Sequence, residues 1–289
     1  MIVVITGPTG VGKTKLSIEL AKLIKAEIIN ADSMQIYKGL DIGTAKIKEE
    51  EKEGITHHLF DIKEVNEDYN VFMYQKDCRN IINKLQKEHK NIIIVGGTVL
   101  YIKAVLYNYE FKEETIKNNY DNLTNEELLN IIKLKDNNCL IHLNNRKRLL
   151  RYLSQLDNES ISTNKKDEVL YDFKIIGLTT NREKLYNIIN VRVDKMISEG
   201  LLLEVKKYYD LNIRSKAILT GIGYKELYEY YDNLITLDES INLIKQRSRK
   251  YAKRQYTFLN NQFNNIKWFN TNYDNFNKTI KEVYDYIKN

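Results

Sequence analysis

Short apolar runs alternate with segments of helical spacing along the first third of the chain. The runs at 2–5, 27–30 and 91–95 centre on isoleucine or valine and end at glycine or small polar residues, which is typical of strands buried in a parallel sheet. Between them, apolar residues recur at helical intervals over 16–24 and 72–85. The pattern predicts an α/β protein in which helices flank a parallel sheet.

The pattern changes in the middle of the chain. No buried-strand run appears from about residue 111 to 171, whereas 126–134 and 146–156 have helical spacing and many charges. A strand at 174–178 and a helix at 181–198 then resume the α/β pattern, and the last third reads as helical. We therefore expect a core domain with a helical C-terminal part and an all-helical insertion, with boundaries at 1–111 and 172–289 for the core and 112–171 for the insertion.

The first apolar run leads into a glycine-rich loop of the form G-x-x-x-x-G-K-T, and a helical pattern follows this phosphate loop directly. Glycines let backbone N–H groups converge on phosphate oxygens, and the helix N-terminus adds partial positive charge. Lys13 supplies a full charge, and the Thr14 hydroxyl is placed to bind Mg²⁺. The sequence predicts a polyphosphate site without specifying the polyphosphate, formed by Gly7, Pro8, Thr9, Gly10, Val11, Gly12, Lys13 and Thr14.

Two other expected strands also end in polar groups. Asp32 and Ser33 follow the second run, and Gly96-Gly97-Thr98 follows the third. Ligands of open α/β sheets bind at the carboxyl ends of the strands, so these residues can face the same crevice as the phosphate loop. Asp and Ser also favour turns and helix caps, and the residues alone leave both interpretations open for 32–33.

The adjacent His57 and His58 point in different directions on a helix or a strand, which favours hydrogen bonding over metal binding.

Basic residues of the insertion and of the following helix each allow two interpretations. Arg146, Lys147, Arg148 and Arg151 form a cluster that is either a solvated helix face or a contact to a nucleic-acid backbone. Arg192 lies between Val191 and Val193 in the helix expected at 181–198, and a lone helical arginine is more often a surface ion-pair partner than a ligand.

A third basic feature, which we call the basic ridge, covers residues 245–254. It holds six basic residues and no acidic one, and Ile244, Tyr251 and Phe258 are spaced to pack against the core. Acidic residues usually interleave with basic ones on solvated helices, so their absence favours a nucleic-acid backbone as the partner.

Charge and cysteine content narrow the functional class. The net charge of +6 permits an anionic partner without requiring one. Cys78 and Cys139 form no C-x-x-C pair, so neither a disulfide framework nor a zinc site is supported, in keeping with a reducing cytoplasm. The N-terminal apolar run leads straight into the phosphate loop, and no other run approaches the length of a membrane span. We expect a cytoplasmic protein without a membrane segment.

Taken together, these motifs resemble the tRNA dimethylallyltransferases, also called tRNA isopentenyltransferases or the IPP transferase family, of the bacterial type. The most specific part is the phosphate loop followed by D-S-x-Q-x-Y at 32–37 and by G-x-D-I-G-T-A-K at 39–46. The other matching pieces are His57-His58, Gly96-Gly97-Thr98 with Leu100-Tyr101, Arg148 with Arg151, Arg192-Val193-Asp194, Ile222-Gly223-Tyr224 and Ala252-Lys253-Arg254-Gln255. The resemblance covers essentially the whole chain and implies a P-loop NTPase-like core.

The resemblance also implies a reaction, the transfer of a dimethylallyl group from dimethylallyl diphosphate to N6 of the adenosine 3′-adjacent to the anticodon in tRNAs. The phosphate loop would then hold the leaving diphosphate with Lys13 and a Mg²⁺ ion at Thr14, and Arg192 would join them. Asp32 matches the general base that takes the N6 proton. Thr9 matches a position close to the diphosphate and the reacting centre.

The partner that the resemblance implies is the tRNA anticodon stem-loop, whose target base must leave the stack to react. We expect a monomer that contacts tRNA through Asp32, Ser33, Met34, Gln35, Thr98, Lys147, Arg148, Arg151, Arg247, Lys250 and Arg254.

Two positions depart from the family pattern. Ile47 stands where proline is usual, and Ile188 stands where many members have a second arginine.

Three other functions share some of these features. A small-molecule kinase or NTPase is the commonest use of a phosphate loop, but Gly96-Gly97-Thr98 stands where an acidic strand end would hold Mg²⁺. An isopentenyltransferase acting on free adenine nucleotides would share the core chemistry, whereas the insertion and the basic ridge favour a large RNA. An RNA-binding module with a vestigial loop is disfavoured because Lys13, Thr14 and Asp32 are intact.

Overall fold

The computed structural model describes residues 1–109, 111, 120–157 and 168–289. The chain folds into two compact units, and the larger one combines residues 1–106 with 170–289. The smaller unit covers 107–169, a few residues away from the 112–171 that we expected for the insertion. Parts of that expected insertion, 112–119 and 158–167, lie outside the described residues.

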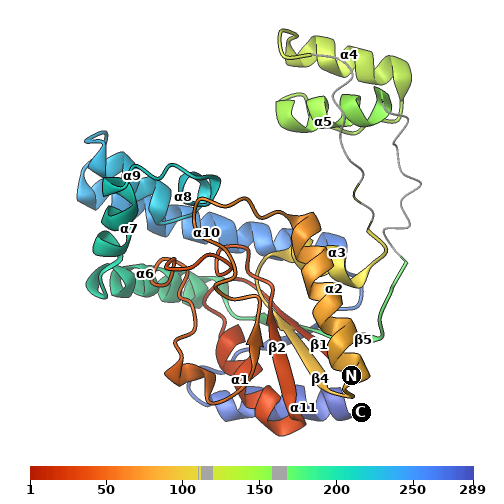
Figure 1. The fold of residues 1–289 in the computed structure, drawn as a ribbon, viewed down its shortest axis with the longest axis vertical. Coiled ribbons are helices and arrows are strands. Elements are labelled where there is room, and N and C mark those ends of the chain that lie inside the picture. Colours follow the sequence, from red (N-terminus) through yellow and green to blue (C-terminus); the bar gives the residue numbers. More distant parts are fainter. Residues whose placement is uncertain (110, 112–119, 158–167) are drawn as a thin grey trace. The chain divides into compact units, whose positions relative to one another are not determined.

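A single parallel sheet forms the centre of the larger unit (Figure 1). Within the described residues it has six strands in the order β3-β2-β4-β1-β5-β6, and each pairing is parallel. Val4 of β1 aligns with Ile94 of β4 on one side and with Ile175 of β5 on the other. The strands are β1 (Ile2–Thr6), β2 (Ala26–Asn30), β3 (His57–His58), β4 (Asn91–Val95), β5 (Phe173–Thr179) and β6 (Lys267–Asn270).

Four of these strands are those that the apolar runs predict, and the predicted α/β class is confirmed. The expectation that the last third is helical is wrong at one place, because β6 pairs with β5 at the edge of the sheet. The cause is visible in its sequence, K-W-F-N, since an edge strand that is only partly buried carries polar residues at both ends.

The helices follow the apolar periodicity, and side-chain caps mark several of their starts. Asn70 accepts hydrogen bonds from the Phe72 and Met73 amides at the start of α2, and Thr124 forms a capping box with Glu127 at the start of α4. The helices are α1 (Lys13–Ile24), η1 (Glu50–Lys52), α2 (Val71–Lys87), α3 (Val99–Leu106), α4 (Asn125–Lys135), α5 (Arg146–Asp157), α6 (Arg182–Ser198), α7 (Leu201–Asp210), α8 (Lys216–Thr220), α9 (Tyr224–Tyr231), α10 (Leu237–Gln262) and α11 (Phe276–Lys288).

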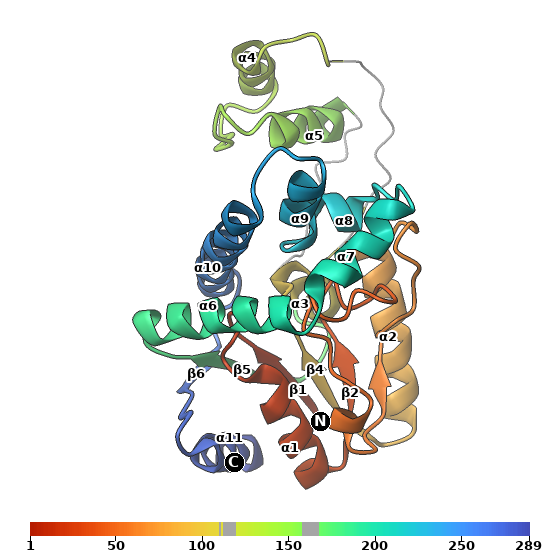
Figure 2. The same ribbon diagram turned by 90° about the vertical axis from the view of Figure 1, so that its left-hand side faces the viewer.

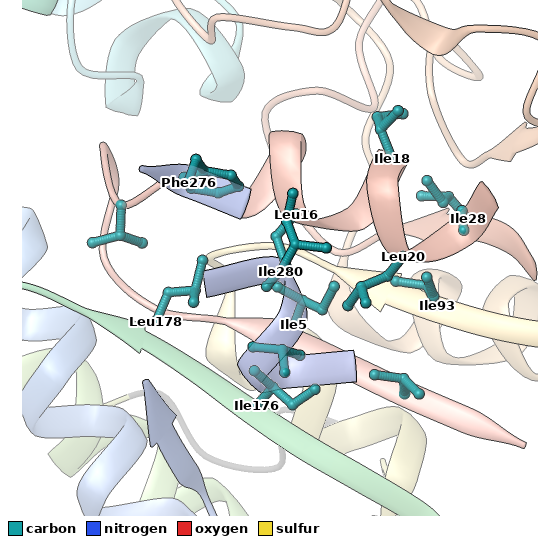
Figure 3. Close-up of a cluster of buried hydrophobic side chains, with 14 of the residues drawn as sticks. Ile5, Leu16, Ile18, Leu20, Ile28, Ile93, Ile176, Leu178, Phe276 and Ile280 are labelled. Atoms are coloured by element: carbon teal, nitrogen blue, oxygen red, sulfur yellow. The ribbon is translucent and has the colours of Figure 1, made fainter. Parts of the chain in front are cut away.

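Helices α1 and α11 cover one face of the sheet, and α2 and α3 cover the other (Figure 1). On the first face, Leu16 and Leu20 of α1 and Ile280 of α11 pack on alternate strand residues such as Ile5 and Ile176 (Figure 3). Every residue of β1 is buried because helices cover both faces, which explains why the strand is a continuous apolar run instead of an alternating one.

A second group of helices, α6 to α10, gathers beyond the carboxyl ends of the strands (Figure 2). The long α10 contacts α3, α6 and α9. It buries Ile244 as predicted, but Phe258 is 36% exposed, so the predicted apolar face is wrong there. Ala252 and Leu259 are buried in its place, because the buried stripe of a 26-residue helix shifts by one position along its length.

The smaller unit is built on α4 and α5. Leu128 and Ile132 of α4 pack against Leu149 and Leu153 of α5 in a separate apolar cluster. Arg146 does not belong to an open basic face, since its guanidinium donates to the carbonyls of Leu123 and Asp121, each at 2.6 Å. Lys147, Arg148 and Arg151 are exposed.

Among the described residues, none of the helices combines the length and the apolar character needed to cross a membrane.

Candidate active site

The phosphate loop connects β1 to α1 at the carboxyl edge of the sheet. Its backbone depends on glycine: Gly7 has φ +139° and Gly12 has φ +90°, and a Cβ on Gly7 would lie 2.4 Å from the Leu178 carbonyl oxygen. Helix α1 begins at Lys13, directly after Gly12. The N–H groups of the first helical turn have no carbonyl partner within the helix and point toward the loop, so they can stabilise an anion bound there.

Lys13 is folded back onto this loop. Its ammonium group donates to the carbonyl oxygens of Gly7 at 3.0 Å and Pro8 at 2.8 Å. Burial lowers the pKa of Lys13 to about 8; the charge of Asp32 opposes this shift and that of Arg192 adds to it. The three side chains are thus close enough to influence one another, and a bound polyanion would favour the charged form of Lys13.

The Gln255 side chain of α10 joins the phosphate loop to the end of β4. Its Oε1 accepts from the Thr9 amide at 3.1 Å, and its Nε2 donates to the Gly97 carbonyl at 2.9 Å. A Cβ on Gly97 would lie 2.3 Å from that Nε2 atom, so only glycine permits the approach. The A-K-R-Q motif at 252–255 thus has a structural function in the site.

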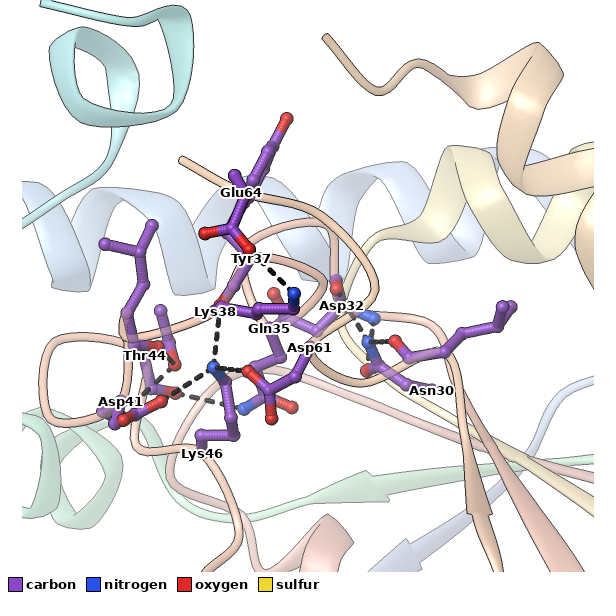
Figure 4. A network of polar contacts seen from close by, with 12 residues as sticks. Asn30, Asp32, Gln35, Tyr37, Lys38, Asp41, Thr44, Lys46, Asp61 and Glu64 are labelled. Atoms are coloured by element: carbon purple, nitrogen blue, oxygen red, sulfur yellow. Dashed lines mark hydrogen bonds and ion pairs between the residues drawn. The ribbon is translucent and has the colours of Figure 1, made fainter. Parts of the chain in front are cut away.

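Polar residues after β2 form a second wall of the site (Figure 4). Asn30 accepts from the Asp32 amide at 2.9 Å and donates to the Asp32 and Leu59 carbonyls. Asp32 Oδ1 accepts from the Met34 amide at 3.0 Å, which fixes the carboxylate in an Asx turn. Thr98 accepts from the Ser33 amide at 3.0 Å. Turn and crevice, the two interpretations left open for 32–33, are both correct here.

These walls enclose a cavity of about 920 Å³ within the larger unit. Arg192 of α6 is half-buried on its wall, and its Nη2 lies 3.4 Å from the Thr44 carbonyl. The interpretation of Arg192 as a surface ion-pair partner is therefore wrong. Burial lowers the pKa of Arg192, and the charge of Asp32 opposes that shift. The predicted site residues on the cavity wall are Thr9, Gly10, Gly12, Lys13, Thr14, Asp32, Ser33, Met34, Gln35, Arg192 and Arg254.

The basic ridge is only partly available to a ligand. Arg247 forms an ion pair with the buried Glu226 at 2.6 Å, and Lys245 pairs with Asp194 at 2.5 Å. Lys250 is exposed, and Arg254 both lines the cavity and lies over the Tyr251 ring. The acidic partners of Arg247 and Lys245 come from other helices, a feature that the local sequence of the ridge does not show.

Sequence reasoning missed the group that shapes the loop at 39–46. The carboxylate of Glu204, on α7, accepts from the amides of Asp41 and Gly43 at 3.0 Å and of Ile42 at 2.7 Å. It also accepts from the Tyr224 hydroxyl at 2.6 Å, and burial together with this contact raises the pKa of Tyr224. The Ile222-Gly223-Tyr224 motif is visible in the sequence, but nothing there links Tyr224 to a glutamate on another helix.

Lys46, at the end of the same loop, is the second such group. Its side chain is 5% exposed and pairs with Asp41 at 2.7 Å and Asp61 at 2.5 Å (Figure 4). The ammonium group also donates to the Tyr37 carbonyl at 2.7 Å. These contacts hold the loop beside Gln35, whose side chain donates to the Thr44 carbonyl at 3.1 Å.

The two histidines at 57 and 58 have hydrogen-bonding roles, as their positions suggest. His57 Nδ1 lies 2.8 Å from the Ile55 carbonyl, and His58 Nε2 lies 2.6 Å from Glu27. In the part of the chain that the structure describes, no group of three or more His, Cys, Asp or Glu side chains is placed to hold a metal.

Comparisons with known proteins find relatives over nearly the whole chain. The family model described as IPP transferase matches residues 35–262. The tRNA dimethylallyltransferase of Anoxybacillus flavithermus is 45% identical to this chain, and the alignment covers 99% of this chain and 96% of that protein. The tRNA dimethylallyltransferase of Bacillus subtilis is 44% identical, with 93% and 90% covered.

Solved structures of the same kind share the fold. The full-length tRNA isopentenylpyrophosphate transferase from Bacillus halodurans matches with a TM-score of 0.79 at 38% identity, covering 99% of this chain and 95% of that one. A eukaryotic dimethylallyltransferase, described as acting on tRNA, matches with a TM-score of 0.83 at 27% identity and covers 99% and 79%. The sequence resemblance is thereby confirmed, and this chain belongs to the IPP transferase family.

Proposed function

We propose that this protein transfers a dimethylallyl group from dimethylallyl diphosphate to N6 of the adenosine 3′-adjacent to the anticodon in tRNAs, releasing diphosphate. The observation that carries the proposal is that the phosphate loop and the Asp32 carboxylate line one cavity together with Arg192. Such a cavity can hold a diphosphate leaving group and a nucleophile that must lose a proton. Relatives named tRNA dimethylallyltransferase support the choice of substrates.

The phosphate loop stabilises the leaving group in this reaction. When the bond between the allylic carbon and the diphosphate oxygen breaks, the electron pair stays on the diphosphate. Backbone N–H groups at the start of α1 and the side chains of Lys13 and Arg192 face the negative charge that develops there. Lys13 would exchange its bonds to the Gly7 and Pro8 carbonyls for bonds to phosphate oxygens.

Asp32 acts on the nucleophile. The N6 lone pair of adenine is delocalised into the ring, so N6 attacks well only if its proton is removed as the new C–N bond forms. The Met34 amide holds Asp32 Oδ1, which orients the carboxylate and leaves Oδ2 to accept the N6 proton. Thr9 lies on the same cavity wall, next to the reacting carbon in the proposed arrangement.

A Mg²⁺ ion fits the oxygen donor present, because the Thr14 hydroxyl lies on the cavity wall and would hold the ion together with oxygens of the diphosphate and of water. When bound, the ion neutralises charge on the departing diphosphate.

The RNA substrate is proposed on two further observations. Ser33, Met34 and Gln35 line the cavity beside Asp32, where they can contact a base that has left its stack. Exposed Lys147 and Arg148 on α5 can bind backbone phosphates, with a salt-dependent contribution to affinity.

The test compares acceptors side by side. Wild-type protein, Mg²⁺ and labelled dimethylallyl diphosphate are incubated with an anticodon stem-loop that carries an A-A-A run after the middle anticodon base, with the same stem-loop carrying G at the target position, and with AMP. We expect label only in the first RNA. Label in AMP but not in RNA would point to a free-nucleotide isopentenyltransferase. ATP turnover without any prenyl transfer would point to a kinase or NTPase.

A further inference from the structure

The outer side of the phosphate loop, away from the cavity, is held by a segment near the C-terminus. The buried Thr271 donates its hydroxyl hydrogen to the Val11 carbonyl at 2.8 Å. The Tyr273 hydroxyl donates to the Gly10 carbonyl at 3.2 Å. This segment follows residue 262, where the match to the family model ends.

These two bonds determine which way the loop amides point. A trans peptide unit is planar, and its C=O and N–H bonds point in opposite directions. The Gly10 carbonyl shares its peptide unit with the Val11 amide, and the Val11 carbonyl shares its unit with the Gly12 amide. Drawing both carbonyls outward therefore turns the Val11 and Gly12 N–H groups inward, toward the anion site.

The segment is itself firmly attached to the core. The Thr271 amide donates to the Thr179 carbonyl at 2.8 Å as the chain leaves the sheet after β6, and the Asn272 amide donates to the Thr279 hydroxyl at 2.9 Å. Phe276, the first residue of α11, packs beside Leu16 and Ile280 (Figure 3). Its ring also backs the loop, because a Cβ on Gly12 would lie 2.8 Å from it.

We propose that Thr271 and Tyr273 are positioning residues that set the affinity of the phosphate loop for the diphosphate group. They act through the backbone of Gly10 to Gly12 and do not touch the ligand. The inference rests on the proposed function, because it takes the anion to be the diphosphate of the prenyl donor. It assigns a part of the binding site to residues beyond the matched stretch of the chain.

The test uses Thr271→Val and Tyr273→Phe, each of which removes one hydroxyl and keeps the shape of the side chain. The probe is inorganic diphosphate with Mg²⁺, titrated calorimetrically into the full-length protein, followed by the KM for dimethylallyl diphosphate. We expect each variant to weaken diphosphate binding about fivefold, as for the loss of one ordinary hydrogen bond, and the pair to weaken it more than either alone. Thr271→Ser, which keeps the hydroxyl, should bind within about twofold of wild type.

Matched controls separate positioning from general destabilisation. The Tyr228 hydroxyl donates to the Ile213 carbonyl at 2.8 Å, away from the loop, and the Thr257 hydroxyl donates within α10. Tyr228→Phe and Thr257→Val should leave diphosphate affinity unchanged, and Tyr273→Phe should leave the affinity for the anticodon stem-loop unchanged.

The outcomes are distinct. Wild-type protein that fails to bind diphosphate overturns the proposed function and the inference with it. Wild-type binding that is matched by both Thr271→Val and Tyr273→Phe overturns the inference alone. Equal weakening in Tyr228→Phe or a parallel loss of RNA binding in Tyr273→Phe would assign the two hydroxyls a purely structural role and also overturn it.

Discussion

Replacing Gln255 by methionine tests whether one amide side chain holds the two halves of the site together. Methionine keeps the unbranched shape of glutamine but removes the acceptor for the Thr9 amide and the donor to the Gly97 carbonyl. Each net hydrogen bond contributes about 1 kcal/mol, and leaving a buried partner unsatisfied raises the cost to about 1–3 kcal/mol. The Thr9 amide lies beside the cavity and can bind water, whereas Gly97 is buried. We therefore expect the free energy of unfolding to fall by about 2–3 kcal/mol.

Urea denaturation of wild type and Gln255→Met measures this loss directly, and the KM for the prenyl donor reports the accompanying shift of the phosphate loop. Gln246→Met is the matched control, since Gln246 is exposed on the same helix and accepts from the neighbouring Lys250. The control should lie within about 0.5 kcal/mol of wild type. If Gln255→Met had the same stability and the same donor KM as the control, the view that this side chain connects the phosphate loop to the end of β4 would be refuted.

Three further predictions concern the chemistry of the cavity. Asp32→Asn keeps the acceptor for the Met34 amide but cannot take a proton. Turnover should therefore fall by about 10²–10⁴-fold, while the Kd for tRNA stays within about twofold. An equal loss of turnover and tRNA binding would argue against a general base. Burial lowers the pKa of Lys13 to about 8, and only the charged form of Lys13 attracts diphosphate. The kcat/KM for the donor should therefore decline as the pH rises above about 8. A flat pH profile up to about pH 9.5 would contradict this. Thr14→Val should raise the Mg²⁺ concentration needed for half-maximal activity by about tenfold, because the hydroxyl ligand is lost. An unchanged Mg²⁺ titration would exclude Thr14 as a ligand.

The sheet and the phosphate loop could be predicted because local patterns encode them. Ile2 to Ile5 is buried on both faces and so reads as a continuous apolar run, and the glycines of the loop are required by its backbone. β6 escaped prediction because an edge strand carries half of that signal, and Phe258 was misassigned because a fixed spacing does not follow the drift of a long helix.

The site was predictable where a motif is contiguous and unpredictable where its partners are distant in the chain. Asp32 and Lys13 were found from their motifs, and a shared crevice was expected because both follow parallel strands. The strand order that places β4 between β2 and β1 was not predicted. Arg192 could be assigned from the residues only to the surface, because nothing in a helical pattern shows that one turn faces a cavity. Glu204 carries no local signal at all, since its amide partners lie about 160 residues earlier. The ion pair of Arg247 with Glu226 likewise joins residues of two different helices, so the local sequence does not reveal it.

The central place of β1 has a consequence for the way the protein is made. β1 pairs with β4 and β5, so its second neighbour is synthesised more than 160 residues later, after the whole smaller unit. At ribosomal rates of about 5–20 residues per second, the nascent chain would carry this largely apolar strand without its complete set of partners for roughly 10–30 s. The same strand order that brings the phosphate loop to the middle of the sheet therefore gives the unfinished chain a period in which an unpaired strand edge is prone to aggregate.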